Sequence, residues 1–313
     1  MHLTSSPLIL ISFLATNLRE VLLSCHLEKE QCDCSFSKNN FTATIECLMP
    51  NETETILDFN ALNFDFTYNT PLSLTINNKL YNSLVDSSGN ASRSFMKQFY
   101  YLNLINNKIA FIQKSSFKHF TNLLILHLGN NKIEYIDACS FEFLKSLQHL
   151  YLNSNRLKQI QNDTFIYLIN LNILNLDQNN IAILPSSLKV LRLIKTLTLN
   201  ENKLSQIESG TFANKTLLEV LALHKNELAH LPEHFLGEMP LLKELYLYSN
   251  EIDQVRRGCF SDLKSLNTLW LQENSIEWIE RGSFESLTSL TSLLLYSNKL
   301  KTIEYGIFSN LGK

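Results

Sequence analysis

Thiols are the side chains of this sequence with the clearest chemical potential, because four of the six cysteines lie within 23 residues. They follow a C-x6-C-x-C-x12-C spacing, at Cys25, Cys32, Cys34 and Cys47. A zinc site usually presents C-x2-C pairs, whose two thiolates can reach one metal ion. In a strand, the two sulfurs of a C-x-C pair point to opposite faces, which suits two disulfides that run in different directions. The spacing therefore favours oxidised cysteines.

Enzymatic chemistry finds little support in the remaining residues. The sequence contains no G-x-S-x-G, H-E-x-x-H, P-loop or G-x-G-x-x-G motif. His127 and His149 are candidates for binding a metal or sensing pH, but we interpret them as polar surface groups. We predict a protein that is not an enzyme and that uses no metal or cofactor.

The balance of charged residues indicates which class of partner to expect. The chain has 27 Lys and Arg against 30 Asp and Glu residues, a net charge of -3. This composition supplies no basic field for a phosphate backbone, so nucleic acid is not an expected partner. With 45% hydrophobic residues, the chain can bury a large core.

The N-terminus predicts secretion. An apolar run at residues 7–15, closed by Arg19 and Glu20, has the length of a signal-peptide core and is too short to span a bilayer. We predict a signal peptide at residues 1–24, and membrane attachment only through a segment that this sequence does not contain. Five N-x-S/T glycosylation sequons agree with an extracellular location, secreted or at the cell surface: Asn40, Asn51, Asn90, Asn162 and Asn214.

One motif, L-x-x-L-x-L-x-x-N-x-I/L, organises the rest of the chain and occurs nine times. Eight copies have 24 residues, and the copy at 171–193 has 23. Most copies end near a phenylalanine such as Phe117, which the short copy replaces with PSSL at 185–188. With the first leucine as position 1, the asparagines at position 9 are Asn107, Asn131, Asn155, Asn179, Asn202, Asn226, Asn250, Asn274 and Asn298.

Each copy predicts one short strand with a buried and an exposed side. In the stretch LYLYSNEI, Leu245 and Leu247 are two residues apart and point into the core, whereas Tyr246 and Tyr248 point to the other face. The asparagine that follows is expected to bond backbone groups that the irregular turn leaves unpaired, both in its own copy and from copy to copy.

These copies resemble the extracellular leucine-rich repeat family over residues 99–313, and the cysteines at 25–47 are similar to its cysteine-rich N-terminal cap. The resemblance implies an α/β solenoid. It would be a right-handed curved horseshoe with a parallel sheet on its concave face and a mostly irregular or 3-10 convex side. The resemblance also implies two cap disulfides, Cys25 with Cys34 and Cys32 with Cys47.

The chain divides accordingly into four parts. They are a signal peptide at 1–24, the cap at 25–56, irregular repeats with a polar loop at 57–98, and nine regular repeats at 99–313. The family's cysteine-rich C-terminal cap does not follow, so we expect either a fragment or a partner that covers the last repeat.

Cys139 and Cys259 stand apart from the cap. They lie five repeats from each other, roughly 24 Å at about 4.8 Å per strand, which is too far for a disulfide. We interpret both as small apolar residues of the convex side.

Exposed aromatic residues gather near both ends of the predicted concave face. Because the leucines fill the core, these rings are available for binding, and clustered Tyr and Trp are typical of protein-binding hot spots. The alternative is that aromatic residues simply suit strands and pack sideways. The C-terminal aromatic patch is Tyr246, Tyr248, Trp270, Leu294 and Tyr296; the N-terminal aromatic patch is Tyr100, Tyr101, Ile105, His127, His149 and Tyr151.

We therefore predict an extracellular module whose concave face recognises a protein ligand or co-receptor, as a fragment of a receptor ectodomain. The first alternative is a structural protein of the extracellular matrix or of cell adhesion. The second is the ectodomain of an innate-immune pattern-recognition receptor. The sequence pattern predicts neither the ligand's identity nor the oligomeric state.

Overall fold

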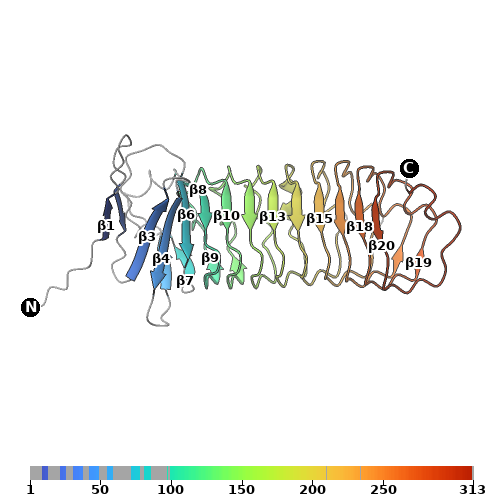
Figure 1. Ribbon diagram of the computed structural model, residues 1–313, viewed down its shortest axis with the longest axis horizontal. Helices are drawn as coiled ribbons and strands as arrows, with labels where there is room; N and C mark the ends of the chain where they lie inside the picture. The colour runs from blue at the N-terminus through green and yellow to red at the C-terminus, as the bar shows by residue number, and fades with distance from the viewer. Residues whose placement is uncertain are drawn as a thin grey trace, which may run out of the picture.

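The computed structural model describes residues 97, 99–208, 210–232 and 234–311, together with the backbone of seven earlier strands. Its main element is one 12-stranded sheet that runs along the whole array (Figure 1). Within residues 99–294 every copy of the motif contributes one strand, and neighbouring strands pair in parallel. These strands are β8 (Phe99–Asn103), β10 (Ile125–His127), β12 (His149–Tyr151), β13 (Ile173–Asn175), β14 (Thr196–Thr198), β15 (Val220–Ala222), β16 (Glu244–Tyr246), β18 (Thr268–Trp270) and β20 (Ser292–Leu294).

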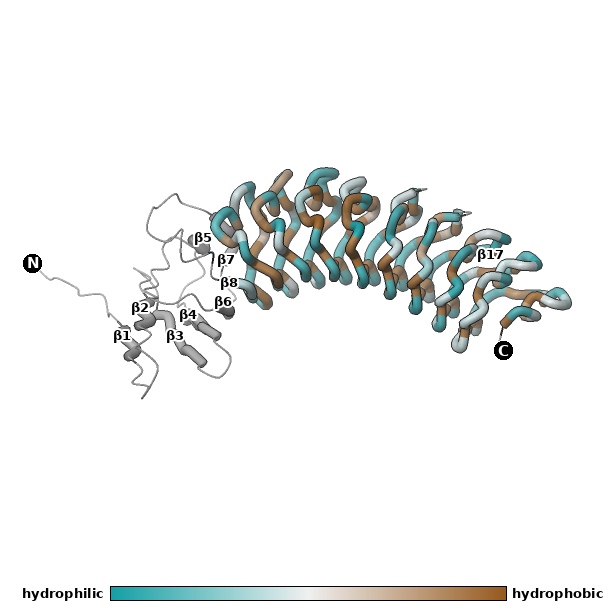
Figure 2. The backbone as a smooth tube through the Cα atoms, turned by 90° about the horizontal axis from the view of Figure 1, so that it is seen from above, coloured by the Kyte–Doolittle hydropathy of each residue, from teal (hydrophilic) through white to brown (hydrophobic). Residues whose placement is uncertain are grey.

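The array curves along its length, with the main sheet on the inner side and β17 (Gln254–Val255) on the outer side (Figure 2). The outer side carries short parallel pairs, β9 (Phe111–Ile112) with β11 (Tyr135–Ile136) and β17 with β19 (Trp278–Ile279). Among the described residues the only helix is η1 (Ser186–Val190), a 3-10 helix. The predicted solenoid, with a parallel concave sheet and an almost helix-free convex side, is therefore confirmed.

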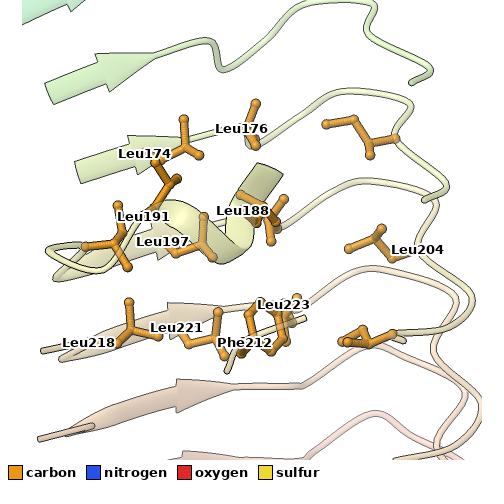
Figure 3. Close-up of a cluster of buried hydrophobic side chains, with 14 of the residues drawn as sticks. Leu174, Leu176, Leu188, Leu191, Leu197, Leu204, Phe212, Leu218, Leu221 and Leu223 are labelled. Carbon is orange, nitrogen blue, oxygen red and sulfur yellow. The ribbon is translucent and has the colours of Figure 1, made fainter. Parts of the chain in front are cut away.

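The core lies between the inner strands and the outer loops. Each inner strand from β8 to β18 buries one leucine, and Leu293 of β20 is partly buried; β15 buries Ala222 as well. The phenylalanines near the ends of the copies stack along the axis, as Phe117 on Phe141 with ring centroids 5.9 Å apart. In the short copy, η1 places Leu188 in the core where the other copies have the phenylalanine, and Leu191 directly after η1 is also buried (Figure 3). The core therefore stays continuous through the shortened turn.

A buried asparagine amide joins each turn to the one before it. Asn179, for example, donates from Nδ2 to the carbonyl oxygens of Leu176 and Leu152, both at 3.0 Å. Its Oδ1 accepts from the backbone N–H of Leu157, also at 3.0 Å. Leu152 and Leu157 belong to the preceding copy, so a single side chain satisfies backbone groups of two turns.

The residue before each asparagine adopts a left-handed backbone conformation, although none of these residues is glycine. Ser249, with φ at 52°, and Glu273, with φ at 57°, are two examples. Such a conformation costs about 1 to 3 kcal/mol for a residue with a Cβ atom. The tight turn persists because the hydrogen bonds of the asparagine side chain hold it on both sides.

One buried position departs from the apolar pattern. Lys215 is fully buried at the place where the neighbouring copies have Leu191 and Met239. Its ammonium group donates to the carbonyl oxygens of Lys189, at 3.4 Å, and Ala213, at 3.5 Å. Burial, together with the nearby charge of Arg192, lowers the pKa of Lys215 to about 8. The lysine thus satisfies a carbonyl group of η1, which only the short copy has.

Before β8, the backbone forms seven strands. They are β1 (Ile9–Ser12), β2 (Leu22–Cys25), β3 (Gln31–Ser37), β4 (Thr42–Leu48), β5 (Thr55–Asp58), β6 (Leu72–Asn77) and β7 (Tyr81–Val85). Strand β6 continues the main sheet from β8 to β4, and β3 pairs with β4 in the antiparallel direction. Strand β7 pairs with β5 and β9, so residues 81–85 of the expected irregular region are an outer strand.

The hairpin of β3 and β4 places Cys32 opposite Cys47 in its register. The side chains of Cys25, Cys32, Cys34 and Cys47 lie outside the described residues, so both cap disulfides stay predictions. The same applies to the signal peptide.

Outside the cap, Cys139 is a free thiol, and the Cys259 thiol donates to the Leu231 carbonyl oxygen at 3.6 Å. Cys259 is buried, and Cys139 is half-buried with Sγ 3.8 Å from the Asp163 carboxylate.

Of the five sequons, Asn40, Asn51 and Asn90 lie outside the described residues, whereas Asn162 and Asn214 are exposed. The Oδ1 atom of Asn162 accepts from the Ser186 N–H at 2.9 Å, which leaves Nδ2, the atom that carries a glycan, free of this bond. Glycosylation at each sequon stays a prediction.

The asparagine bridge predicts a large difference between two adjacent residues. We expect Asn179→Ala to lower the free energy of unfolding by about 1 to 3 kcal/mol for each backbone group left unpaired. Asn180→Ala is the matched control, because the Asn180 side chain is half-buried and forms no comparable bridge. The free energy of unfolding of both variants is measured by urea unfolding, monitored by circular dichroism. Equal midpoints for Asn179→Ala and Asn180→Ala would contradict a bridging role.

Candidate functional site

Alternation along each inner strand separates the core from an open face. In and after β16, Leu245 and Leu247 are fully buried, whereas Tyr246 and Tyr248 remain half-buried on the concave surface. The same pattern of a buried centre between partly exposed neighbours recurs in β10, β12, β13, β14 and β18. The predicted division between core leucines and outward-facing rings is therefore present in the structure.

The C-terminal aromatic patch is centred on Trp270, whose ring contacts those of Tyr246 and Tyr248. The register sets Tyr246 opposite Trp270 and Trp270 opposite Leu294. Tyr246 meets Trp270 edge to face with centroids 4.9 Å apart, and Tyr248 lies 6.0 Å from Trp270. Tyr296 completes the patch as its most exposed member, at 57%. All five predicted residues thus lie on one surface, and their role in binding stays a prediction.

Polar atoms orient the two central rings. The Tyr246 hydroxyl donates to Glu244 Oε2 at 2.7 Å, and Trp270 Nε1 donates to Ser292 Oγ at 3.2 Å. Burial and the adjacent Glu244 carboxylate raise the pKa of Tyr246 to about 12. The phenol therefore stays protonated at neutral pH and acts as a fixed donor.

Two further residues belong to this surface that the sequence analysis did not single out. His224 stacks on Tyr248 with ring centroids 4.2 Å apart and meets Tyr246 edge to face at 6.2 Å. Gln272 is 5% exposed and lies between Tyr248 and Tyr296 in the same column of the repeat. Reading position 7 from copy to copy finds both residues, but neither residue type signals burial against a ring.

Two buried polar atoms of this surface have no hydrogen-bond partner among the described residues: Gln272 Oε1 and His224 Nδ1. Burial lowers the pKa of His224 to about 4; the Lys225 ammonium adds to this effect, and the Glu201 carboxylate opposes it. The imidazole is therefore neutral at physiological pH. A buried polar atom without a partner costs free energy, so a ligand that reached either atom and paired with it would gain that free energy.

The N-terminal aromatic patch also contains rings in contact with one another. His127 stacks on Tyr151 with centroids 4.1 Å apart, and His149 meets Tyr151 edge to face at 6.4 Å. Tyr101 joins the group 5.6 Å from His127. Burial lowers the pKa of His127, and it also lowers the pKa of His149. Strands β13, β14 and β15 lie between β12 of this patch and β16 of the C-terminal one.

Between the patches, the concave face is polar. Burial raises the pKa of Asp177 to about 6, although Asp177 Oδ1 accepts from the Asn200 N–H at 3.0 Å. Gln178 Nε2 donates to Glu201 at 3.1 Å, and the Lys225 ammonium pairs with Glu201 at 2.9 Å. Within the described parts of the chain, no cluster of three or more His, Cys, Asp and Glu residues is arranged to hold a metal ion.

The outer side has one hollow of about 580 Å³. It is polar at its rim, where Arg257 is held by a bidentate bond to Glu285 at 3.1 Å and Glu280 Oε2 accepts from the Arg257 N–H at 2.8 Å. No Phe, Tyr or Trp lines it. A search of the described residues finds no helix with the length and apolar character that crossing a membrane requires.

Comparison with protein families matches a leucine rich repeat model to residues 97–157, 146–204, 192–252, 216–276, 240–300 and 265–313. No curated protein gives a significant match. Among solved structures, the chain is similar to a TLR13–ssRNA13 complex, at 24% identity and a TM-score of 0.60 over 82% of this chain. It is also similar to a leucine-rich repeat protein of Leptospira interrogans, at 26% identity and a TM-score of 0.63 over 77% of this chain. The matches cover 43% and 58% of those two chains.

The environment of His224 predicts an abnormal titration. We expect its ring resonances, followed by NMR, to titrate near pH 4 in the folded protein and near 6.5 in protein unfolded with urea. Between these two values only the unfolded chain takes up the proton, so His224 makes the free energy of unfolding fall as the pH falls from 6.5 to 4. A folded-state midpoint near 6.5 would show that the ring is not desolvated against Tyr248.

Proposed function

Because the chain belongs to the leucine-rich repeat family, we propose that it is an extracellular binding module whose concave face holds a protein ligand. The C-terminal aromatic patch is the anchor of this interaction. Leucine-rich repeat domains are protein-interaction modules and are generally scaffolds without catalytic activity. Beyond these family properties, we propose three points for this chain: that its ligand is a protein, that it acts outside the cell, and that the C-terminal aromatic patch anchors the ligand.

The observation that carries the proposal is the state of the aromatic rings. Trp270 contacts both Tyr246 and Tyr248 on the open face, while Leu245 and Leu269 fill the core behind them. The rings are thus dispensable for the core and are held in place before a ligand arrives. Rigid aromatic side chains bury a large area at low entropic cost, which is why they dominate the energetics of protein interfaces.

The ectodomain of an innate-immune pattern-recognition receptor is the second candidate, and the likeness to the TLR13 structure is compatible with it. That structure carries a single-stranded RNA, but its 24% identity to this chain supports a common fold and nothing about a shared ligand. This chain matches 43% of the TLR13 chain, so any activity of a longer receptor is also a proposal. The matrix or adhesion alternative predicts self-association, which light scattering over a range of protein concentrations measures.

The proposal predicts that ligand binding depends on two rings. We expect Tyr246→Ala/Trp270→Ala to weaken binding at least about thirtyfold, as loss of a hot spot does. The ligands to test are hits from an arrayed library of secreted and cell-surface proteins, with each Kd measured by surface plasmon resonance. Circular dichroism checks that the variant keeps its fold.

The matched control is Tyr135→Ala/Trp278→Ala, because it removes the same two residue types from the outer strands β11 and β19. Their side chains are 39% and 40% exposed, so their loss should leave each Kd unchanged. The proposal fails when every hit binds the concave-face variant as tightly as the unmodified protein. It also fails when both double variants lose binding equally.

A further inference from the structure

We propose that the protein ligand anchors on the C-terminal aromatic patch through an arginine side chain, presented by a basic segment of the partner. This inference rests on the proposed function and specifies the chemistry of its ligand. Three independent features of the surface lead to it: ring faces, unpaired carboxylates and a buried acceptor without a partner.

The rings provide the first feature. Tyr246 and Trp270 pack edge to face, and Tyr248 is tilted by 54° against Trp270, so the patch offers ring surfaces in several orientations. A guanidinium group stacks on aromatic faces and is more weakly hydrated than an ammonium group. The neutral His224 ring next to Tyr248 does not repel a cation.

The charges around the patch provide the second feature. Lys225 pairs with Glu201 at 2.9 Å and Lys243 pairs with Glu219 at 2.6 Å, so both nearby ammonium groups already have a carboxylate partner.

Two other carboxylates at the patch, those of Glu244 and Glu273, have no cationic partner among the described residues. Their carboxylates accept hydrogen bonds from Tyr246 and Ser249, and neither forms an ion pair within the described residues. The surface therefore carries two negative charges that a cationic ligand would neutralise.

The buried acceptor provides the third feature. Gln272 Oε1 is shielded from solvent and has no donor among the described residues, in the column between Tyr248 and Tyr296. A guanidinium group has five N–H donors and no acceptor, in a planar array that can serve an amide oxygen and a carboxylate together. When the Gln272 amide turns toward the open face, an arginine can satisfy an oxygen that the protein itself leaves without a donor.

The N-terminal aromatic patch shows that rings alone do not define this site. Tyr101, His127 and Tyr151 also stack there, but the outward positions of the first three copies, 99–106, 123–130 and 147–154, contain no Asp or Glu. Only the C-terminal patch combines rings with unpaired carboxylates. A phosphate-bearing ligand would meet Glu244 and Glu273 there and would be repelled.

The test uses short peptides and the fluorescence of Trp270. The chain has two tryptophans, so Trp278→Phe leaves Trp270 as the only reporter. Hexa-arginine, hexalysine and hexacitrulline are titrated into this protein, because citrulline keeps the shape of arginine without its charge. We expect hexa-arginine to change the Trp270 emission and to bind at least about tenfold more tightly than hexacitrulline, with hexalysine between them.

A charge-matched pair of variants locates the binding. Glu244→Gln/Glu273→Gln should weaken hexa-arginine binding by about fivefold or more, whereas Glu134→Gln/Glu227→Gln, which removes two carboxylates away from the patch, should not. Glutamine at position 244 still accepts from the Tyr246 hydroxyl, so the change tests charge alone. Equal Kd values for hexa-arginine and hexacitrulline would overturn the inference, as would equal effects of the two double variants.

Two other probes define the remaining outcomes. Tighter binding of a hexauridine RNA or of a chitin hexasaccharide than of hexa-arginine would overturn the arginine assignment in favour of stacking by bases or sugars. The library screen separates this failure from failure of the proposed function. Hits that require Tyr246 and Trp270, with no preference for arginine, would leave the function standing and remove only this inference.

Discussion

A side-chain amide that bridges two turns is the interaction on which this structure depends. The nine motif asparagines each follow a residue in the left-handed conformation, and each donates Nδ2 to nearby carbonyl groups. From Asn131 onward, the amide also bonds a carbonyl group of the preceding copy. The same asparagine side chain therefore holds the strained turn and links that turn to the preceding copy. It sets the spacing and register of the inner strands and so the place of every side chain on the concave face.

A fixed register separates stability from recognition. Position 4 of each copy is a leucine, buried in every copy except the last, where Leu293 is partly buried. Positions 5 and 7 change freely from Asn and Asp at the centre to Tyr and Trp near β18. A repeat scaffold can therefore gather rings from successive turns without altering its core. This arrangement costs free energy at the patch itself, because Gln272 Oε1 and His224 Nδ1 are buried there without partners among the described residues.

Much of this architecture could be predicted from the sequence, because the pattern repeats nine times. The strands, the core leucines and the clustering of Tyr246, Tyr248 and Trp270 follow from the alternation of side chains along each strand. Features that occur once were missed. The fully buried Lys215 depends on the carbonyl group of η1, and η1 occurs in the one copy with 23 residues. The stacking of His224 on Tyr248 depends on side-chain orientations, which no residue pattern encodes. The outer strands β17 and β19 have only two residues each, too few for a detectable alternation.

The central claim is that side chains alternate between the two faces of each inner strand. The rings therefore stay accessible, while the turns held by the asparagines keep the neighbouring leucines buried. Hydroxyl-radical footprinting with mass spectrometry tests it most directly, by comparing the oxidation rate of each residue in the folded protein with its rate in the urea-unfolded chain. We expect strong protection of Leu245, Leu247 and Leu269, and weak protection of Tyr246, Tyr248 and Trp270. Protection of the three rings equal to that of the three leucines would contradict the account.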